Sequence, residues 1–199
     1  MTISVAIGTY GNDHWKQTAS RAIDSAQNQT VSAHEIIHIH GSSLHDARNL
    51  AASKCTGDWI VFLDADDELD SKYLESMSQK ISLLDSDLWL VQPSTLGIVD
   101  GRQDPHPVVI PSKKSILDGN WMVIGTMVSK SVFTSVGGFS DLQMYEDWDL
   151  WIRCIKFGCK TTVCENAIYK VHVRNDSRNN QSRNLQISTY NKIRNKYMN

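Results

Sequence analysis

The sequence has no long apolar run and few of the features that mark special classes of protein. None of its 199 residues belongs to a stretch of about 18 consecutive apolar residues, the length that a membrane-spanning helix requires. The N-terminus has no basic segment ahead of an apolar one, so it does not resemble a signal peptide, and we expect a first strand there. A formal net charge of −2 gives no overall attraction to nucleic acid or to anionic membranes.

Cysteine and proline are scarce, with four of each. No two cysteines form a C-x-x-C pair, and the spacing of five between Cys154, Cys159 and Cys164 is not a standard zinc pattern. We therefore interpret these three and Cys55 as reduced structural thiols, and we expect a cytoplasmic protein.

Apolar, β-prone segments alternate with segments of helical periodicity along the chain. This alternation predicts the α/β class, as a single compact domain with a mostly parallel sheet flanked by helices. The expected strands are 3–7, 35–40, 59–63, 88–92, 122–128, 161–163 and 168–173, the expected helices are 13–28, 47–52, 71–84, 131–136 and 147–157, and residues 97–111 are expected to form a loop.

An acidic cluster follows the continuous apolar strand 59–63, in the sequence Asp64-Ala65-Asp66-Asp67-Glu68. Carboxylates this close repel one another unless something neutralises them, and a divalent cation is the usual solution. Mg²⁺ and Mn²⁺ prefer carboxylate oxygens and often take further ligands from a substrate diphosphate. The alternative is a solvated acidic start of a helix. Because ligands of α/β sheets bind at the carboxyl ends of strands, the position favours the metal site.

The C-terminal segment differs in charge from the rest. Residues 174–199 contain six Lys/Arg and one acid, a charge of +5, which leaves −7 for residues 1–173. The charges are interleaved with Asn, Gln and Ser, so we expect a partly ordered lid or an arm for homo-oligomer formation. Contact with an anionic partner is the alternative.

Several segments together resemble the family 2 glycosyltransferases, which are inverting GT-A enzymes that use nucleotide sugars. The resemblance covers the chain in order from residue 3 to about 173. It is carried by Val5-Ala6-Ile7-Gly8-Thr9-Tyr10-Gly11, by Gln29-Thr30 with Glu35-Ile36-Ile37, by Ala47-Arg48-Asn49 with Gly57-Asp58 and the D-x-D motif Asp64-Ala65-Asp66-Asp67, by Gly137-Gly138-Phe139 with Glu146-Asp147-Trp148-Asp149, and by Tyr169-Lys170-Val171-His172.

On the donor side, the resemblance implies contacts to a nucleotide-diphosphate sugar. Asp64 would contact the ribose or sugar, Asp66 would bind Mn²⁺ or Mg²⁺, and Asp67 would support the sugar side. Arg48 would contact the diphosphate, with a surface helix charge as the alternative. Further donor contacts would come from Thr9, Tyr10 and His40.

On the acceptor side, the resemblance implies that Asp147 is the general base, which must lie within hydrogen-bond reach of the acceptor hydroxyl. Glu146 would orient this base or touch the acceptor. His172 would be a second metal ligand; the alternative is a strand histidine hydrogen-bonded within the protein. Trp148 and Trp151 could line an acceptor cleft, but their spacing is more typical of core residues.

The sequence departs from the family in two places. Gly8 and Gly11 replace the usual Pro and Asn of the opening motif. Where the family has two Asp, one of which reads the nucleotide base, this chain has His38-Ile39-His40, so a uracil preference does not follow. Only residues 42–46 separate this point from Ala47-Arg48-Asn49, which indicates a shortened member lacking one helix–strand unit.

These features predict a metal-dependent inverting glycosyltransferase. We expect a GT-A domain at 1–173, with a nucleotide-sugar half at about 1–95 and an acceptor half at about 96–173, and a basic polar tail at 174–199. The acceptor could be a glycan, a lipid-linked glycan, a protein or a modified nucleobase. One alternative is a catalytically idle sugar-nucleotide-binding or scaffolding domain. Another is a nucleotidyltransferase, but this class normally has a glycine-rich phosphate loop near the N-terminus, and Gly8-Thr9-Tyr10-Gly11 has too few glycines for one.

Overall fold

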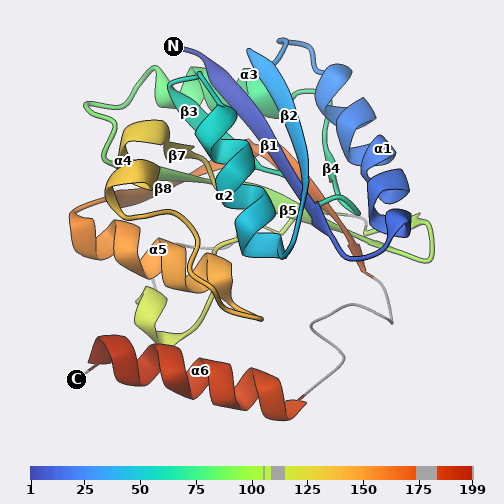
Figure 1. The fold of residues 1–199 in the computed structure, drawn as a ribbon. Coiled ribbons are helices and arrows are strands. Elements are labelled where there is room, and N and C mark those ends of the chain that lie inside the picture. Colours follow the sequence, from blue (N-terminus) through green and yellow to red (C-terminus); the bar gives the residue numbers. More distant parts are fainter. Residues whose placement is uncertain (105, 109–114, 174–182, 199) are drawn as a thin grey trace.

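The computed structural model describes residues 1–104, 106–108, 115–173 and 183–198, and it has the predicted α/β architecture (Figure 1). The strands are β1 (Ile3–Tyr10), β2 (Glu35–Gly41), β3 (Trp59–Phe62), β4 (Glu68–Leu69), β5 (Trp89–Val99), β6 (Arg102–Gln103), β7 (Val128–Ser129) and β8 (Lys160–Val173). The helices are α1 (Asp13–Gln27), α2 (Leu44–Lys54), α3 (Tyr73–Ile81), α4 (Lys130–Ser135), α5 (Glu146–Phe157) and α6 (Arg183–Met198), with a 3₁₀ turn η1 (Ile116–Asp118).

The strands form two four-stranded sheets, in the orders β2-β1-β3-β7 and β4-β8-β5-β6. The long pairings, β1 with β2, β1 with β3, and β5 with β8, are parallel, and the short ones are antiparallel. All four residues of β3 are buried, as expected of a continuous apolar strand covered on both faces. The fold class is confirmed, and the parallel β1, β2 and β3 bring their carboxyl ends to one edge.

The chain from β5 to β8 differs from the sequence prediction. β5 runs on to Val99, into the predicted loop, while residues 105 and 109–111 of that loop lie outside the described part. The two predicted late strands are one strand, β8, whose pairing with β5 shifts register between Pro93 and Ser94. Proline has no N–H to donate to the ladder, so an irregularity at this point is expected. Of the predicted strand 122–128, only residue 128 lies in a strand, β7.

The basic tail contains helix α6, which the sequence did not predict. Figure 1 shows α6 next to α5, with η1 beside both. Tyr190 stacks on Trp148 with ring centroids 5.1 Å apart, and Ile193 is buried. This part of the expected lid or arm therefore folds against its own domain; residues 174–182 lie outside the described part.

The buried carboxylate of Asp149 makes several of the polar contacts that hold α6 in place. It accepts hydrogen bonds from Lys196 Nζ at 2.8 Å, Tyr197 Oη at 2.7 Å and Ser140 Oγ at 2.6 Å, and pairs with Arg153 at 2.8 Å. Burial alone would raise the pKa of Asp149, but the bonds from Lys196, Ser140 and Tyr197 outweigh it and lower the pKa to about 2.

Asp149→Asn should lower the free energy of unfolding at pH 7 by about 2 kcal/mol, because each unit of pKa shift corresponds to about 1.4 kcal/mol. The folded-state pKa is lowered, so the contribution is present above the unfolded-state pKa near 4 and is lost as the pH falls towards 2. Urea unfolding between pH 7 and pH 3 measures this, with the exposed Asp100→Asn as the control. An equal pH dependence in wild type and Asp149→Asn would contradict the assignment.

Two glycines allow α2 to approach the first sheet very closely. A Cβ on Gly8 would lie 2.8 Å from Cγ and 3.0 Å from the backbone N of Arg48, and a Cβ on Gly41 would lie 2.9 Å from the backbone N of Ala47. Real Cβ atoms essentially never come that close to backbone. Gly8, one of the departures from the family pattern, therefore has a packing reason.

The four cysteines are free and buried, as the sequence analysis expected. Burial raises the pKa of the Cys55, Cys154, Cys159 and Cys164 thiols above the usual value, which keeps them protonated and unreactive. Within the described ranges, every helix is too short or too polar to cross a bilayer.

Candidate active site

Six of the predicted site residues lie in three segments that meet at the carboxyl edge of β1, β2 and β3. Asp64, Asp66 and Asp67 follow β3 directly, Arg48 lies on α2, and Glu146 and Asp147 open α5. The backbone of the acid cluster is fixed by a turn, in which the Asp67 N–H donates to the Asp64 carbonyl at 3.1 Å. The Asp64 N–H donates to the hydroxyl of Tyr169 on β8 at 3.1 Å.

The acids crowd together as the sequence predicted. Asp67 is 7% exposed and accepts a hydrogen bond from the backbone N–H of His172 at 2.9 Å. Burial, followed by the negative charges of Asp64 and Asp66, raises the pKa of Asp67 well above its usual value. The charged form of Asp67 is therefore disfavoured in the fold, and a cation bound beside the cluster would relieve this.

Arg48 joins the donor side to the acceptor side. It is 3% exposed, pairs with Asp64, and donates from Nη1 to Oε1 of Glu146 at 2.7 Å. Its guanidinium carbon lies 5.2 Å from the ring centroid of Phe139. Burial would lower the pKa of Arg48, but Asp64 and Glu146 outweigh it and hold that pKa above its usual value. The alternative of a surface helix charge is wrong, and the diphosphate contact stays a prediction.

Asp147 has the environment of a general base. Its Oδ2 accepts from Asn120 Nδ2 at 2.9 Å, and its Oδ1 accepts from the backbone N–H of Trp148 at 2.8 Å. Burial, followed by the negative charge of Glu146, raises the pKa of Asp147 to about 6. A base is most effective when its pKa lies near the working pH, so this shift suits proton abstraction near neutrality.

The residue ahead of this pair, Tyr145, has an unusual backbone. Its φ of 59° and ψ of 26° place it in the left-handed region, where a residue with a side chain is rarely found. Such conformations persist only where the surrounding structure enforces them, and they cluster at functional sites. Neither Tyr145 nor Asn120 was singled out from the sequence, because neither a left-handed residue nor a loop amide has a sequence pattern.

His172 makes the contacts of the alternative interpretation, hydrogen bonds within the protein. Its Nε2 lies 2.6 Å from Oε1 of Glu68, and its Nδ1 lies 2.9 Å from Nη1 of Arg21. No group of three or more His, Cys, Asp or Glu side chains that could hold a metal ion occurs in the described residues. A ligand role for His172 would require it to leave Glu68, and the metal site stays a prediction.

The ends of β1 and β2 hold three more of the predicted residues. Thr9 is 2% exposed, and its hydroxyl lies 2.9 Å from Nε2 of His38 and 3.1 Å from Nδ1 of His40. The next residue, Tyr10, is 37% exposed. Because β1 and β3 are parallel neighbours, these side chains end at the same edge of the sheet as the acid cluster.

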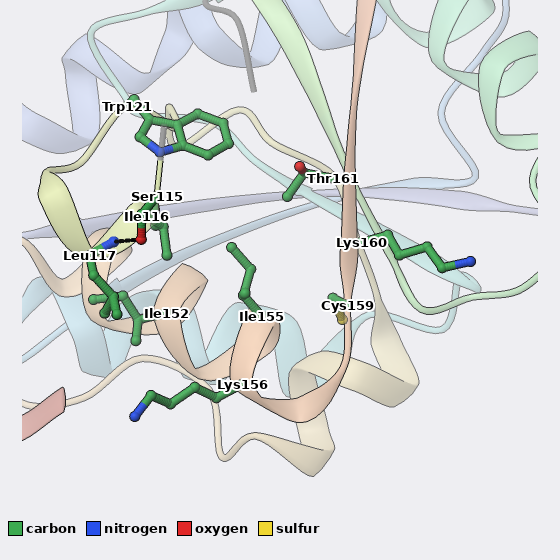
Figure 2. Close-up of a pocket in the computed structure, with 10 residues that line it drawn as sticks. All are labelled: Ser115, Ile116, Leu117, Trp121, Ile152, Ile155, Lys156, Cys159, Lys160 and Thr161. Carbon is green, nitrogen blue, oxygen red and sulfur yellow. Dashed lines mark hydrogen bonds between the residues drawn. The ribbon is translucent and has the colours of Figure 1, made fainter. Parts of the chain in front are cut away.

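Trp148 and Trp151 are core residues, as their spacing favoured, with 1% and 0% exposure. Beyond them a separate cavity of about 310 Å³ lies between α5 and the segment around η1 (Figure 2). Trp121, Leu117 and Ile155 line this cavity. The ammonium groups of Lys156 and Lys160 extend away from these three residues. Lys156 donates to the carbonyl of Tyr197, and Lys160 pairs with Asp85. None of the predicted site residues lines this cavity.

The comparisons with known proteins concern the fold and one segment of the sequence. The sequence model described as glycosyl transferase family 2 matches residues 38–117, which include Arg48 and the acid cluster. The crystal structure of S. aureus TarS matches with a TM-score of 0.65 and 14% identity, over 88% of this chain and 37% of that one. S. aureus TarS 1–349 matches in complex with UDP (TM-score 0.68, 15% identity) and with UDP-GlcNAc (TM-score 0.70, 14% identity). These two matches cover all of this chain and 71% and 72% of theirs.

The matches establish the fold and a family resemblance over part of the chain. None of the curated proteins matches. The chain spans little more than a third of the full TarS chain. At these identities the structural likeness establishes the GT-A fold, while the family match covers the segment from His38 to Leu117.

Proposed function

We propose, from the premise that this chain carries a glycosyl transferase family 2 segment within a GT-A fold, that it is an inverting, metal-dependent glycosyltransferase acting on a nucleotide-diphosphate sugar. The observation that carries the proposal is the continuous chain of contacts from Asp64 through Arg48 to Glu146, next to the candidate base. It joins a carboxylate cluster suited to a donor with a carboxylate suited to activating an acceptor.

In this proposal Asp147 takes the proton of the acceptor hydroxyl. The hydroxyl oxygen then attacks the anomeric carbon of the donor sugar, and the bond from that carbon to the diphosphate breaks. A single displacement of this kind inverts the anomeric centre. Its raised pKa makes Asp147 basic enough to take this proton, which it must release to solvent before the next acceptor binds.

The donor would bind at the acid cluster. The solved relatives hold UDP and UDP-GlcNAc, which supports a nucleotide-diphosphate donor of the same class. We propose that Asp66, with diphosphate oxygens, holds Mn²⁺ or Mg²⁺, which would neutralise the charge of the leaving diphosphate. The crowding that raises the pKa of Asp67 supports a cation there. His172 joins the ligands in this proposal only if it leaves Glu68.

Asp66→Ala should remove the part of nucleotide binding that depends on metal. Isothermal titration of UDP and CDP, each with Mn²⁺ and with a chelator, measures it: wild type should bind more tightly with Mn²⁺, and the variant should bind equally in both conditions. The control is Glu165→Ala, an exposed carboxylate outside the cluster, which should keep the difference. A full metal effect in Asp66→Ala would move the metal elsewhere.

The second candidate is an idle domain that binds sugar nucleotides without transferring the sugar. The observation that favours it is His172, whose two ring nitrogens are both engaged within the protein. Incubation of the folded protein with UDP- and CDP-sugars and Mn²⁺, with water or added glycans as acceptors, separates the two candidates. Release of nucleoside diphosphate that depends on Asp147 supports the enzyme, and tight binding without release supports the idle domain.

A further inference from the structure

The pair of histidines on β2 shares a single hydroxyl. His38 and His40 project from the same face of the strand, and their Nε2 and Nδ1 atoms lie 2.9 Å and 3.1 Å from Oγ1 of Thr9. This hydroxyl also lies 3.5 Å from the carbonyl of Ile39. A hydroxyl has one proton to donate and two lone pairs to accept with, so it cannot donate to both rings at once.

The two rings therefore cannot both accept a hydrogen bond from Thr9. If Thr9 donates to Nδ1 of His40, then Nε2–H of His38 donates to Thr9, and His40 carries its own proton on Nε2. If instead Nδ1–H of His40 donates to Thr9, then Thr9 donates to His38 or to the Ile39 carbonyl, and Nε2 of His40 is a bare lone pair. In the described part of the chain, Nε2 of His40 has no hydrogen-bond partner.

The outer nitrogen of His40 can thus be a donor or an acceptor without any movement of heavy atoms. We propose that this histidine relay, made of Thr9, His38 and His40, reads the base of the donor nucleotide and accepts uridine and cytidine diphosphates alike near neutral pH. The proposal rests on the proposed function, since the nucleotide must lie at the carboxyl ends of β1 and β2. Uracil presents N3–H, which needs an acceptor, and cytosine presents a lone pair at N3, which needs a donor.

The experiment is isothermal titration of UDP and CDP with Mn²⁺ at pH 7.5. We expect dissociation constants within about threefold of each other for the wild type. The ratio of the two affinities cancels the contribution of the shared diphosphate and metal. His40→Asp, which only accepts above its pKa near 4, should prefer UDP by about tenfold, the worth of one hydrogen bond to a charged group.

The matched control is His34→Asp, a histidine outside the relay whose ring contacts Thr56; it should keep the wild-type ratio of affinities. A wild-type preference of about tenfold or more for one nucleotide, or an unchanged ratio in His40→Asp, would overturn the relay and leave the proposed function standing. If neither nucleotide binds the folded protein, the donor site itself is wrong, and the relay fails with it.

Discussion

Asp147→Asn should keep nucleotide binding and lose transfer by about two to four orders of magnitude, the usual contribution of a general base. The substitution preserves size and leaves one oxygen, which can accept from the Trp148 N–H, while Asn120 can turn its own side-chain oxygen to the new amide; the loss then reports the missing base. The pKa of Asp147 is raised in the fold, which means that the ionised form is disfavoured there. The neutral variant should therefore melt at the same or a higher temperature, which separates lost chemistry from lost folding.

The pH profile gives an independent check on Asp147. The base works only when it is deprotonated, so kcat/KM should be level above about pH 7 and fall about tenfold per unit below pH 6. The residual activity of Asp147→Asn should lack this acid limb. The exposed Asp118→Asn, an Asp-to-Asn change outside the site, should match wild type in both rate and profile. Near-normal turnover in Asp147→Asn would place the base elsewhere.

Arg48→Met should be the most destabilising single change at the site, by about 3–5 kcal/mol, the usual cost of leaving a buried charge without its partner. The partner Glu146 is 2% exposed, so water cannot replace the lost guanidinium. For a domain of this size the expected fall in melting temperature is about 6–20 °C. Differential scanning calorimetry at neutral pH measures it.

Two further variants make this result specific. The double variant Arg48→Met with Glu146→Gln should recover part of the loss, because it also removes the negative charge of Glu146, which the guanidinium of Arg48 no longer balances. Lys16→Met breaks an exposed ion pair with Asp13, and such pairs contribute about 1 kcal/mol or less, so it should change the melting temperature little. Equal effects of Arg48→Met and Lys16→Met would show that the buried bridge adds no more than a surface contact.

The local elements of the fold could be predicted because their signals are local. The apolar run of β3, the acids that follow it and the helical periodicity of α1 and α5 each lie within a few residues. The register shift of β8 could not be predicted, since it depends on Pro93, about seventy residues earlier in the chain. Helix α6 could not be predicted for a similar reason. Its sequence is polar, and it is stabilised by contacts with distant residues, among them the buried carboxylate of Asp149 on α5.

In the candidate site, too, the local features could be predicted and the contacts between distant segments could not. The residue types and their order identified Asp64, Asp66 and Asp147, but their partners come from distant segments. The sequence places Arg48 near neither Asp64 nor Glu146, yet the fold buries it between them. Arg21 meets His172 across 151 positions, a contact that no motif contains. Pairings of this kind depend on the packing of the whole domain, so only the structure reveals them.

The close approach of α2 to the first sheet also limits which residues positions 8 and 41 can hold. A Cβ at position 8 would lie 2.8 Å from Cγ of Arg48, and a Cβ at position 41 would lie 2.9 Å from the backbone N of Ala47. The proline of the family pattern at position 8 would therefore push α2, and with it the guanidinium of Arg48, away from the acid cluster. Homologues in which α2 lies this close to the sheet should carry glycine at both positions.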